Sequence, residues 1–118
     1  MSKKVAIPID IYGHLEKSFG HNQWFALIDI RDSEVVFAEN VEPPVHEYGL
    51  LPQWLMELGV TDVIANEIGK NAIQLLTNFG IHTYAGAPQL RISELVNKFL
   101  KGELKIISAH SSLNIDKQ

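Results

Sequence analysis

Apolar and polar positions in the first 42 residues follow the pattern of short β-strands. Apolar runs occupy residues 5–9 and 24–30, and a third run begins at Val35 and fades at Glu42. The polar residues 31–34 predict a turn, so the second and third runs should pair as a hairpin. The first two runs are joined by a long polar loop at 10–23 that contains two glycines.

Helical spacing replaces this pattern after residue 50. Apolar side chains recur three or four residues apart, and a glycine follows each stripe, as is typical of helix ends. Two short β-rich runs, at 63–65 and 81–85, separate the three predicted helices. Periodicity is weak from residue 103, which predicts a single domain over 1–102 and a weakly structured C-terminal tail over 103–118. The helical stripes are Leu51, Trp54, Leu55 and Leu58; Ala72, Leu75, Leu76 and Phe79; and Ile92, Leu95, Val96, Phe99 and Leu100.

The predicted order β-β-β-α-β-α-β-α indicates an α/β protein with a mixed five-stranded sheet covered by helices. If the first three strands alternate in direction and the crossovers are right-handed, the first, third, fourth and fifth strands run parallel. Their carboxyl ends then share one edge of the sheet, together with the loops 10–23, 42–50, 66–70 and 85–91. Ligands of open α/β sheets bind at such an edge.

Three histidines fall in these edge loops and are candidate metal ligands, namely His14, His21 and His46. Asp10 and Glu47 lie in the same loops, and imidazole with carboxylate suits zinc, iron, nickel or manganese. The spacing is not that of a tight metal motif, so each histidine could equally be a solvated loop side chain. Asp10 could likewise cap the turn that follows the first strand.

The start of the second predicted helix is a further candidate. Gly69 and Lys70 directly follow Ile68, and the N–H groups of a helix start with a neighbouring lysine can hold an anion. The segment matches neither a phosphate-binding loop nor a dinucleotide fingerprint. A plain helix start after a short loop is the alternative interpretation.

Composition limits the function classes. The chain has 118 residues, 46% of them apolar, a net charge of −4 and no cysteine. Disulfides and thiolate chemistry are thereby excluded, and an acidic chain does not favour nucleic acid as a partner. No apolar run is long enough for a membrane span, so we expect a cytoplasmic protein. No complete catalytic group is recognisable, and we expect no enzymatic activity.

Five segments carry a resemblance through their order and spacing, namely 5–10 (VAIPID), 19–25 (FGHNQWF), 58–64 (LGVTDVI), 68–72 (IGKNA) and 79–84 (FGIHTY). Together they resemble the dinitrogenase iron-molybdenum cofactor biosynthesis family over residues 3–102. The resemblance implies a three-layer α/β/α, ribonuclease H-like fold. It also implies a non-enzymatic domain that binds or carries an iron-sulfur or iron-molybdenum cofactor, with a cofactor donor or acceptor protein as partner.

The resemblance places Ser18, Phe19 and Gly20 in the cofactor-binding segment of that family. Relatives commonly carry His-Phe-Gly at these positions, and serine is a poor ligand for soft iron. This departure keeps an alternative open. The chain could be a cofactor-free regulatory or protein-interaction module that binds a partner or a small anion at the same edge.

Overall fold

The first three strands form the antiparallel meander that the sequence predicts. A computed structural model describes residues 2–44 and 50–107, and its first strands are β1 (Ser2–Ile9), β2 (Trp24–Arg31) and β3 (Glu34–Val41). Asp32 and Ser33 join β2 to β3 with φ angles of 51° and 66°. A two-residue connection with both φ angles positive is the hairpin turn whose twist matches the flanking strands. The predicted hairpin is therefore confirmed.

The second half of the chain alternates helices with short strands, also as predicted. Its elements are α1 (Leu50–Glu57), β4 (Asp62–Ile64), α2 (Lys70–Asn78), β5 (His82–Tyr84), α3 (Ile92–Leu100) and β6 (Ile106–Ile107). None of the helices in the described ranges is long and apolar enough to cross a membrane.

The prediction of five strands is wrong, because β6 adds a sixth. It pairs antiparallel with β5 at the edge of the sheet. Two residues are too few to show a period in the sequence, so only the tertiary structure reveals this strand. The division at residue 102 stays a prediction, and residues 108–118 of the predicted tail lie outside the described part of the chain.

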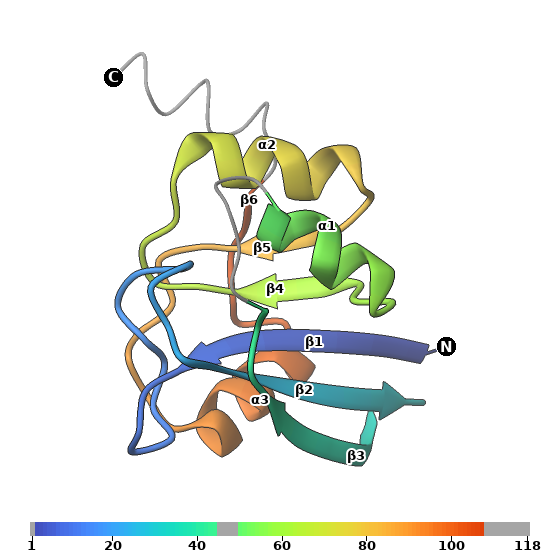
Figure 1. Ribbon diagram of the computed structural model, residues 1–118. Helices are drawn as coiled ribbons and strands as arrows, with labels where there is room; N and C mark the ends of the chain where they lie inside the picture. Colours follow the sequence, from blue (N-terminus) through green and yellow to red (C-terminus); the bar gives the residue numbers. More distant parts are fainter. Residues whose placement is uncertain (1, 45–49, 108–118) are drawn as a thin grey trace.

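The strand order is β3-β2-β1-β4-β5-β6 (Figure 1). β1 runs antiparallel to β2 and parallel to β4, and β4 runs parallel to β5. The carboxyl ends of β1, β3, β4 and β5 consequently share one edge, which we call the carboxyl edge. The ribonuclease H-like label stays a prediction.

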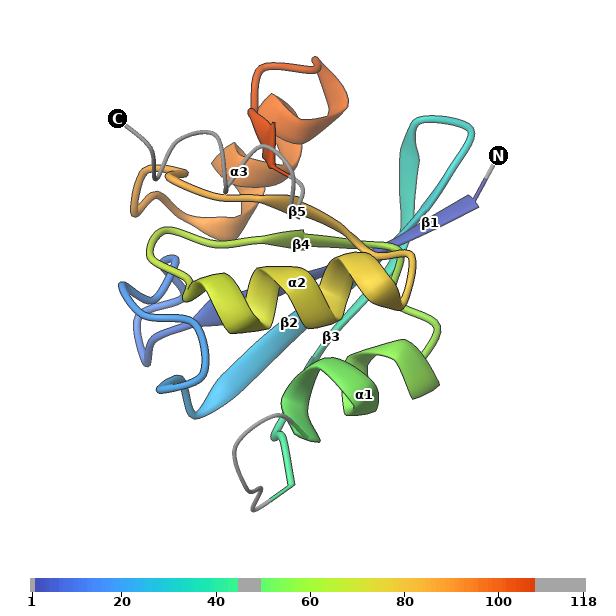
Figure 2. The ribbon, with the colours of Figure 1, turned by 90° about the horizontal axis from the view of Figure 1, so that it is seen from above.

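Helices cover both faces of the sheet, as Figure 2 shows with α1 and α2 on one side and α3 on the other. Successive residues of β1 point to opposite faces. Val5 and Ile7 pack with Leu95 of α3, whereas Ala6 packs with Leu55 of α1 and Leu76 of α2. This alternation gives the protein three layers, helices–sheet–helix, with one hydrophobic core on each face of the sheet.

The two tryptophans are packing residues, and Trp54 belongs to the first predicted helical stripe. Trp54 lies 5.9 Å from Phe25, measured between ring centroids, on the face that α1 covers. Trp24 packs against the core on the α3 face. Packing therefore accounts for both rings without any role in binding a ligand.

A buried carboxylate marks the start of β4, at the edge opposite the carboxyl edge. Asp62 is 1% exposed and accepts hydrogen bonds from the hydroxyl groups of Thr61 (2.5 Å) and Tyr84 (3.2 Å). Nδ1 of His82 lies 3.7 Å from the same carboxylate. Burial, and then the charge of Asp62 and its hydrogen bond, raise the pKa of Tyr84 to about 12.

This pKa predicts a loss of stability at alkaline pH. The unfolded tyrosine ionises near pH 10, so the contribution of Tyr84 is complete below pH 10 and falls as the pH rises through 12. Tyr84→Phe should abolish this loss and remove the phenolate absorbance that appears near pH 12. Urea unfolding between pH 9 and 12, with absorbance titration, checks both. Tyr12→Phe, at a position 77% exposed, is the control that keeps the transition. Ionisation of Tyr84 at pH 10 in the folded protein would contradict the assignment.

Candidate functional site

The loop between β1 and β2 is hydrogen-bonded to a second loop of the carboxyl edge, the one between β4 and α2. The N–H of Phe19 donates to the carbonyl oxygen of Glu67 (2.9 Å), and the N–H of Glu67 donates back to that of Lys17 (2.9 Å). These bonds make a short parallel bridge between Ser18 and Glu67. The predicted meeting of loops 10–23 and 66–70 is confirmed.

The same loop is also tied to the segment between β5 and α3. Leu15 is completely buried, and its N–H donates to the carbonyl oxygen of Leu90 (2.9 Å). His14 forms an antiparallel bridge with Arg91. Loops 10–23, 66–70 and 85–91 therefore form one connected surface, while most of the fourth predicted loop, 42–50, lies outside the described residues.

Asp10 caps the turn after β1. Its Oδ1 accepts the N–H of Tyr12 (2.9 Å) and the N–H of His14 (3.0 Å). The alternative interpretation of Asp10 as a loop cap is thus confirmed. Nδ1 of His14 lies 4.0 Å from the same Oδ1, so the carboxylate and one candidate imidazole are neighbours. The turn fixes the backbone of His14 and leaves its side chain half-buried.

The segment Ser18–His21 makes a tight turn later in the same loop. The N–H of His21 donates to the carbonyl oxygen of Ser18 (3.2 Å), and Gly20 has a φ of 97°. Any other residue at position 20 would be strained at this backbone angle, although its Cβ would touch no neighbouring atom. Phe19 packs at 5.8 Å against Phe25, so its ring anchors the turn in the core. His21 remains exposed at the tip.

Asn22 is a site residue that the sequence did not single out. Its side chain is 7% exposed; Oδ1 accepts the N–H of Gly20 (3.0 Å), and Nδ2 donates to the carbonyl oxygen of Trp24 (2.8 Å). A buried amide with both ends bonded fixes the geometry of the His21 turn. Only its position two residues after a loop glycine hinted at this role.

Gly69 and Lys70 lie at the same edge, two and three residues after Glu67. Gly69 precedes α2 in an extended conformation, with no side-chain cap, and a Cβ built on it would meet no atom within 4 Å. Lys70 is exposed. The start of α2, which has no side-chain cap and begins with Lys70, therefore lies at the carboxyl edge.

The described residues contain no group of three or more histidine, cysteine, aspartate or glutamate side chains placed to hold one metal ion. His46 and Glu47 lie outside the described residues, so their predicted role stays a prediction. His82 is the first residue of β5 and therefore lies at the opposite edge.

Comparisons with known proteins agree with the fold. The family model described as dinitrogenase iron-molybdenum cofactor matches residues 1–102. The crystal structure of PH0822 is similar at 35% identity, covering 87% of this chain and 93% of that one, with a TM-score of 0.77. A comparison with curated proteins gave no match.

Two further structures share the fold at lower identity. The apo form of the orange protein from Desulfovibrio gigas is 22% identical, with a TM-score of 0.76, covering 89% of this chain and 92% of that one. A protein from Methanocaldococcus jannaschii is 22% identical, with a TM-score of 0.75, covering 92% of this chain and 97% of that one.

Asn22→Ala should loosen the turn that carries His21. Two hydrogen bonds are lost and buried partners are left unpaired, so the free energy of unfolding should fall by about 1–3 kcal/mol. The amide hydrogen of Gly20 should exchange faster, because it loses its acceptor. Urea unfolding and amide exchange measure the two effects. Gln23→Ala, at the exposed neighbouring position, should change stability by less than about 0.5 kcal/mol. Equal effects of the two substitutions would contradict the role of Asn22.

Proposed function

Since this chain belongs to the dinitrogenase iron-molybdenum cofactor family, we propose that it binds an iron-sulfur or iron-molybdenum type cofactor at the carboxyl edge and passes it on. The observation that carries the proposal is the family match over residues 1–102, which contains every loop of that edge. The backbone bridges between those loops support it, because they hold His14 and His21 on one connected surface.

The available donors favour a preassembled cofactor over a single metal ion. A lone ion needs several protein ligands, and the described residues offer no group of three. A cluster already has sulfide around its metals, so one or two imidazoles suffice to hold it. In this proposal His14 and His21 donate from the described loops, and His46 donates from the loop before α1.

The other predicted site residues then shape and charge the surface. Asp10 orients His14 through the turn that it caps. Phe19 and Gly20 set the turn under His21, and Ser18 adds a hydroxyl beside it. Gly69 and Lys70 place the positive end of α2 toward an anionic cluster. Glu47 remains a proposed neighbour of His46.

Few protein ligands suit a carrier, because the cofactor must leave again. The partners in this proposal are a protein that donates the cofactor and one that accepts it, and no chemical step is assigned to the chain itself. The small number of imidazoles holds the cofactor loosely enough for transfer. The backbone bridges between the loops keep the surface in one shape while the cofactor passes from the donor protein to the acceptor protein.

A cofactor-free module of the same fold is the second candidate. Ser18, where relatives commonly carry histidine, favours it, as does the lack of a three-ligand group in the described residues. Such a module would bind a partner protein or a small anion at the same edge.

Iron retention distinguishes the two candidates. Untagged protein, incubated with iron and sulfide without oxygen and then desalted, should retain stoichiometric iron by elemental analysis. His14→Ala and His21→Ala should each weaken retention by about tenfold or more, since even the loss of a residue behind a ligand costs that much. Ser18→His should strengthen retention by adding an imidazole.

His82→Ala is the matched control, because His82 is an exposed histidine at the opposite edge. It should retain as much iron as the parent protein. Metal-free protein under all conditions, or equal retention in all four variants, would overturn the carrier proposal and favour the cofactor-free module.

A further inference from the structure

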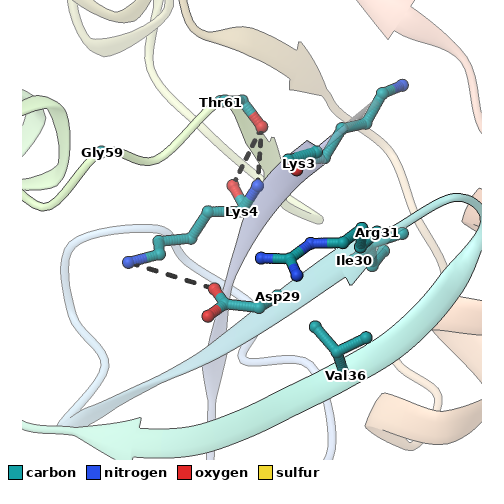
Figure 3. A pocket seen from close by; sticks show the side chains of 9 residues that line it. Lys3, Lys4, Asp29, Ile30, Arg31, Val36, Gly59 and Thr61 are labelled. Atoms are coloured by element: carbon teal, nitrogen blue, oxygen red, sulfur yellow. Dashed lines mark hydrogen bonds and ion pairs between the residues drawn. The ribbon is translucent and has the colours of Figure 1, made fainter.

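A hollow lies at the end of the sheet opposite the carboxyl edge. It has a volume of about 380 Å³ and is bounded by the first residues of β1, the end of β2 and the turn from α1 to β4 (Figure 3). This size is in the range of small-molecule sites. None of the proposed cofactor ligands lines it, so it requires its own explanation. Its lining residues include Lys4, Asp29, Arg31, Val36, Gly59 and Thr61.

The residues that line the hollow carry a net positive charge, whereas the whole chain is acidic. The protein has a net charge of −4, yet three of its ten basic residues line this one hollow, with one of its fourteen acidic residues. Lys3 contributes at a distance, because its Nζ lies on the other face of the sheet, 5.2 Å from the ring centroid of Phe99. Lys4 and Arg31 lie on the near face, where Asp29 is the opposing charge.

Arg31 points its guanidinium into the hollow from the end of β2 (Figure 3). Its side chain makes no ion pair or hydrogen bond with any residue in the ranges 2–44 and 50–107. A planar guanidinium presents a fork of N–H donors that fits the paired oxygens of phosphate or carboxylate. An unused fork aimed into a hollow is therefore a ready anion contact.

Lys4 is held beside it by neighbouring groups. Its backbone N–H donates to Oγ1 of Thr61 (2.9 Å), and its Nζ donates to the carbonyl oxygen of Leu58 (3.1 Å). The distance from Nζ to Asp29 is 4.0 Å, and both side chains are about a third exposed, so this ion pair is weak. The ammonium is thus oriented by Asp29 and still able to turn toward a bound anion.

Val36 gives the hollow an apolar wall. Asp29 pairs with Phe37 and Ile30 pairs with Val35, so Val36 is the extra residue of a β-bulge. Bulges redirect a side chain from its regular place on a strand. Here the bulge places Val36 beside Arg31 at the hollow, although the side chain is 55% exposed.

We propose that this hollow binds a small phosphate monoester, with its phosphate on Arg31 and Lys4 and its organic part against Val36. A phosphate monoester carries nearly two negative charges at neutral pH, which suits the two cations that line the hollow on this face and the field of Lys3. The volume exceeds the need of a free phosphate ion, and the apolar wall would be unused by one. The inference is independent of the cofactor proposal, because it concerns the opposite edge.

Titration with phenyl phosphate, followed by the amide signals of the protein in NMR, tests the proposal. Saturable shifts should appear at Lys4, Arg31 and Thr61. Arg31→Gln should weaken binding by roughly tenfold, the cost of one charge-assisted hydrogen-bonded contact. Arg91→Gln removes the same charge elsewhere and should leave the affinity unchanged. Arg31→Lys, which keeps the charge without the fork, should fall between the parent protein and Arg31→Gln.

Two further probes separate the parts of the ligand. Phenol, which lacks the phosphate, should not bind at this hollow, and inorganic phosphate should bind more weakly than phenyl phosphate. Phenol binding as tightly as phenyl phosphate would overturn the role of the cations. Inorganic phosphate binding equally well would overturn the role of Val36. Absence of saturable shifts, or equal affinity in Arg31→Gln with its native signal dispersion kept, would overturn the proposal as a whole.

Discussion

Burial of β1 on both faces is the constraint from which the rest of the architecture follows. Val5, Ala6 and Ile7 are completely buried, and consecutive residues of a strand face opposite ways, so each face needs a cover. α1 and α2 supply one cover and α3 the other. The antiparallel meander gives β3 the direction of β1, and the crossovers through α1 and α2 keep β4 and β5 in that direction. Parallel strands bring their carboxyl ends together, and this is why three separate loops meet at one edge.

The two ends of the sheet consequently differ in chemistry. At the carboxyl edge the backbone groups of the loops bond to each other, as in the bridge between Ser18 and Glu67, while the imidazole of His21 remains exposed. At the opposite end β2 ends at Arg31, β3 begins at Glu34 and β4 begins at Asp62, and Arg31 has its guanidinium in an open hollow. The carboxyl edge suits a cargo that brings its own ligands, and the opposite end suits an anion. The two proposals thus assign different ligands to different ends of one sheet.

Local pattern predicted most of the fold, because strand and helix periods are properties of a few neighbouring residues. The cap formed by Asp10 was also within reach, since its partners lie two and four residues away. β6 was not, because a strand of two residues is defined by its pairing with β5 and not by a period.

The sequence predicted where in the fold the site lies, but it did not predict the contacts between its residues. Topology brought His14 and His21 to one edge, but burial of Asn22 depends on the turn that it closes. The hollow at Arg31 requires β1, β2, a bulge in β3 and the turn after α1 to meet, and no local pattern encodes that meeting. The roles of His46 and Glu47 stay predictions.

The measurement that tests the central claim most directly is paramagnetic broadening of amide signals in protein loaded with an iron-sulfur cluster under exclusion of oxygen. Iron broadens the signals of nearby amides, so the affected residues locate the cluster. The account predicts broadening at residues 14–21 and 67–70, with Lys4 and Arg31 unaffected. Broadening centred on Arg31 and Thr61, or no broadening at the carboxyl edge despite bound iron, would contradict it.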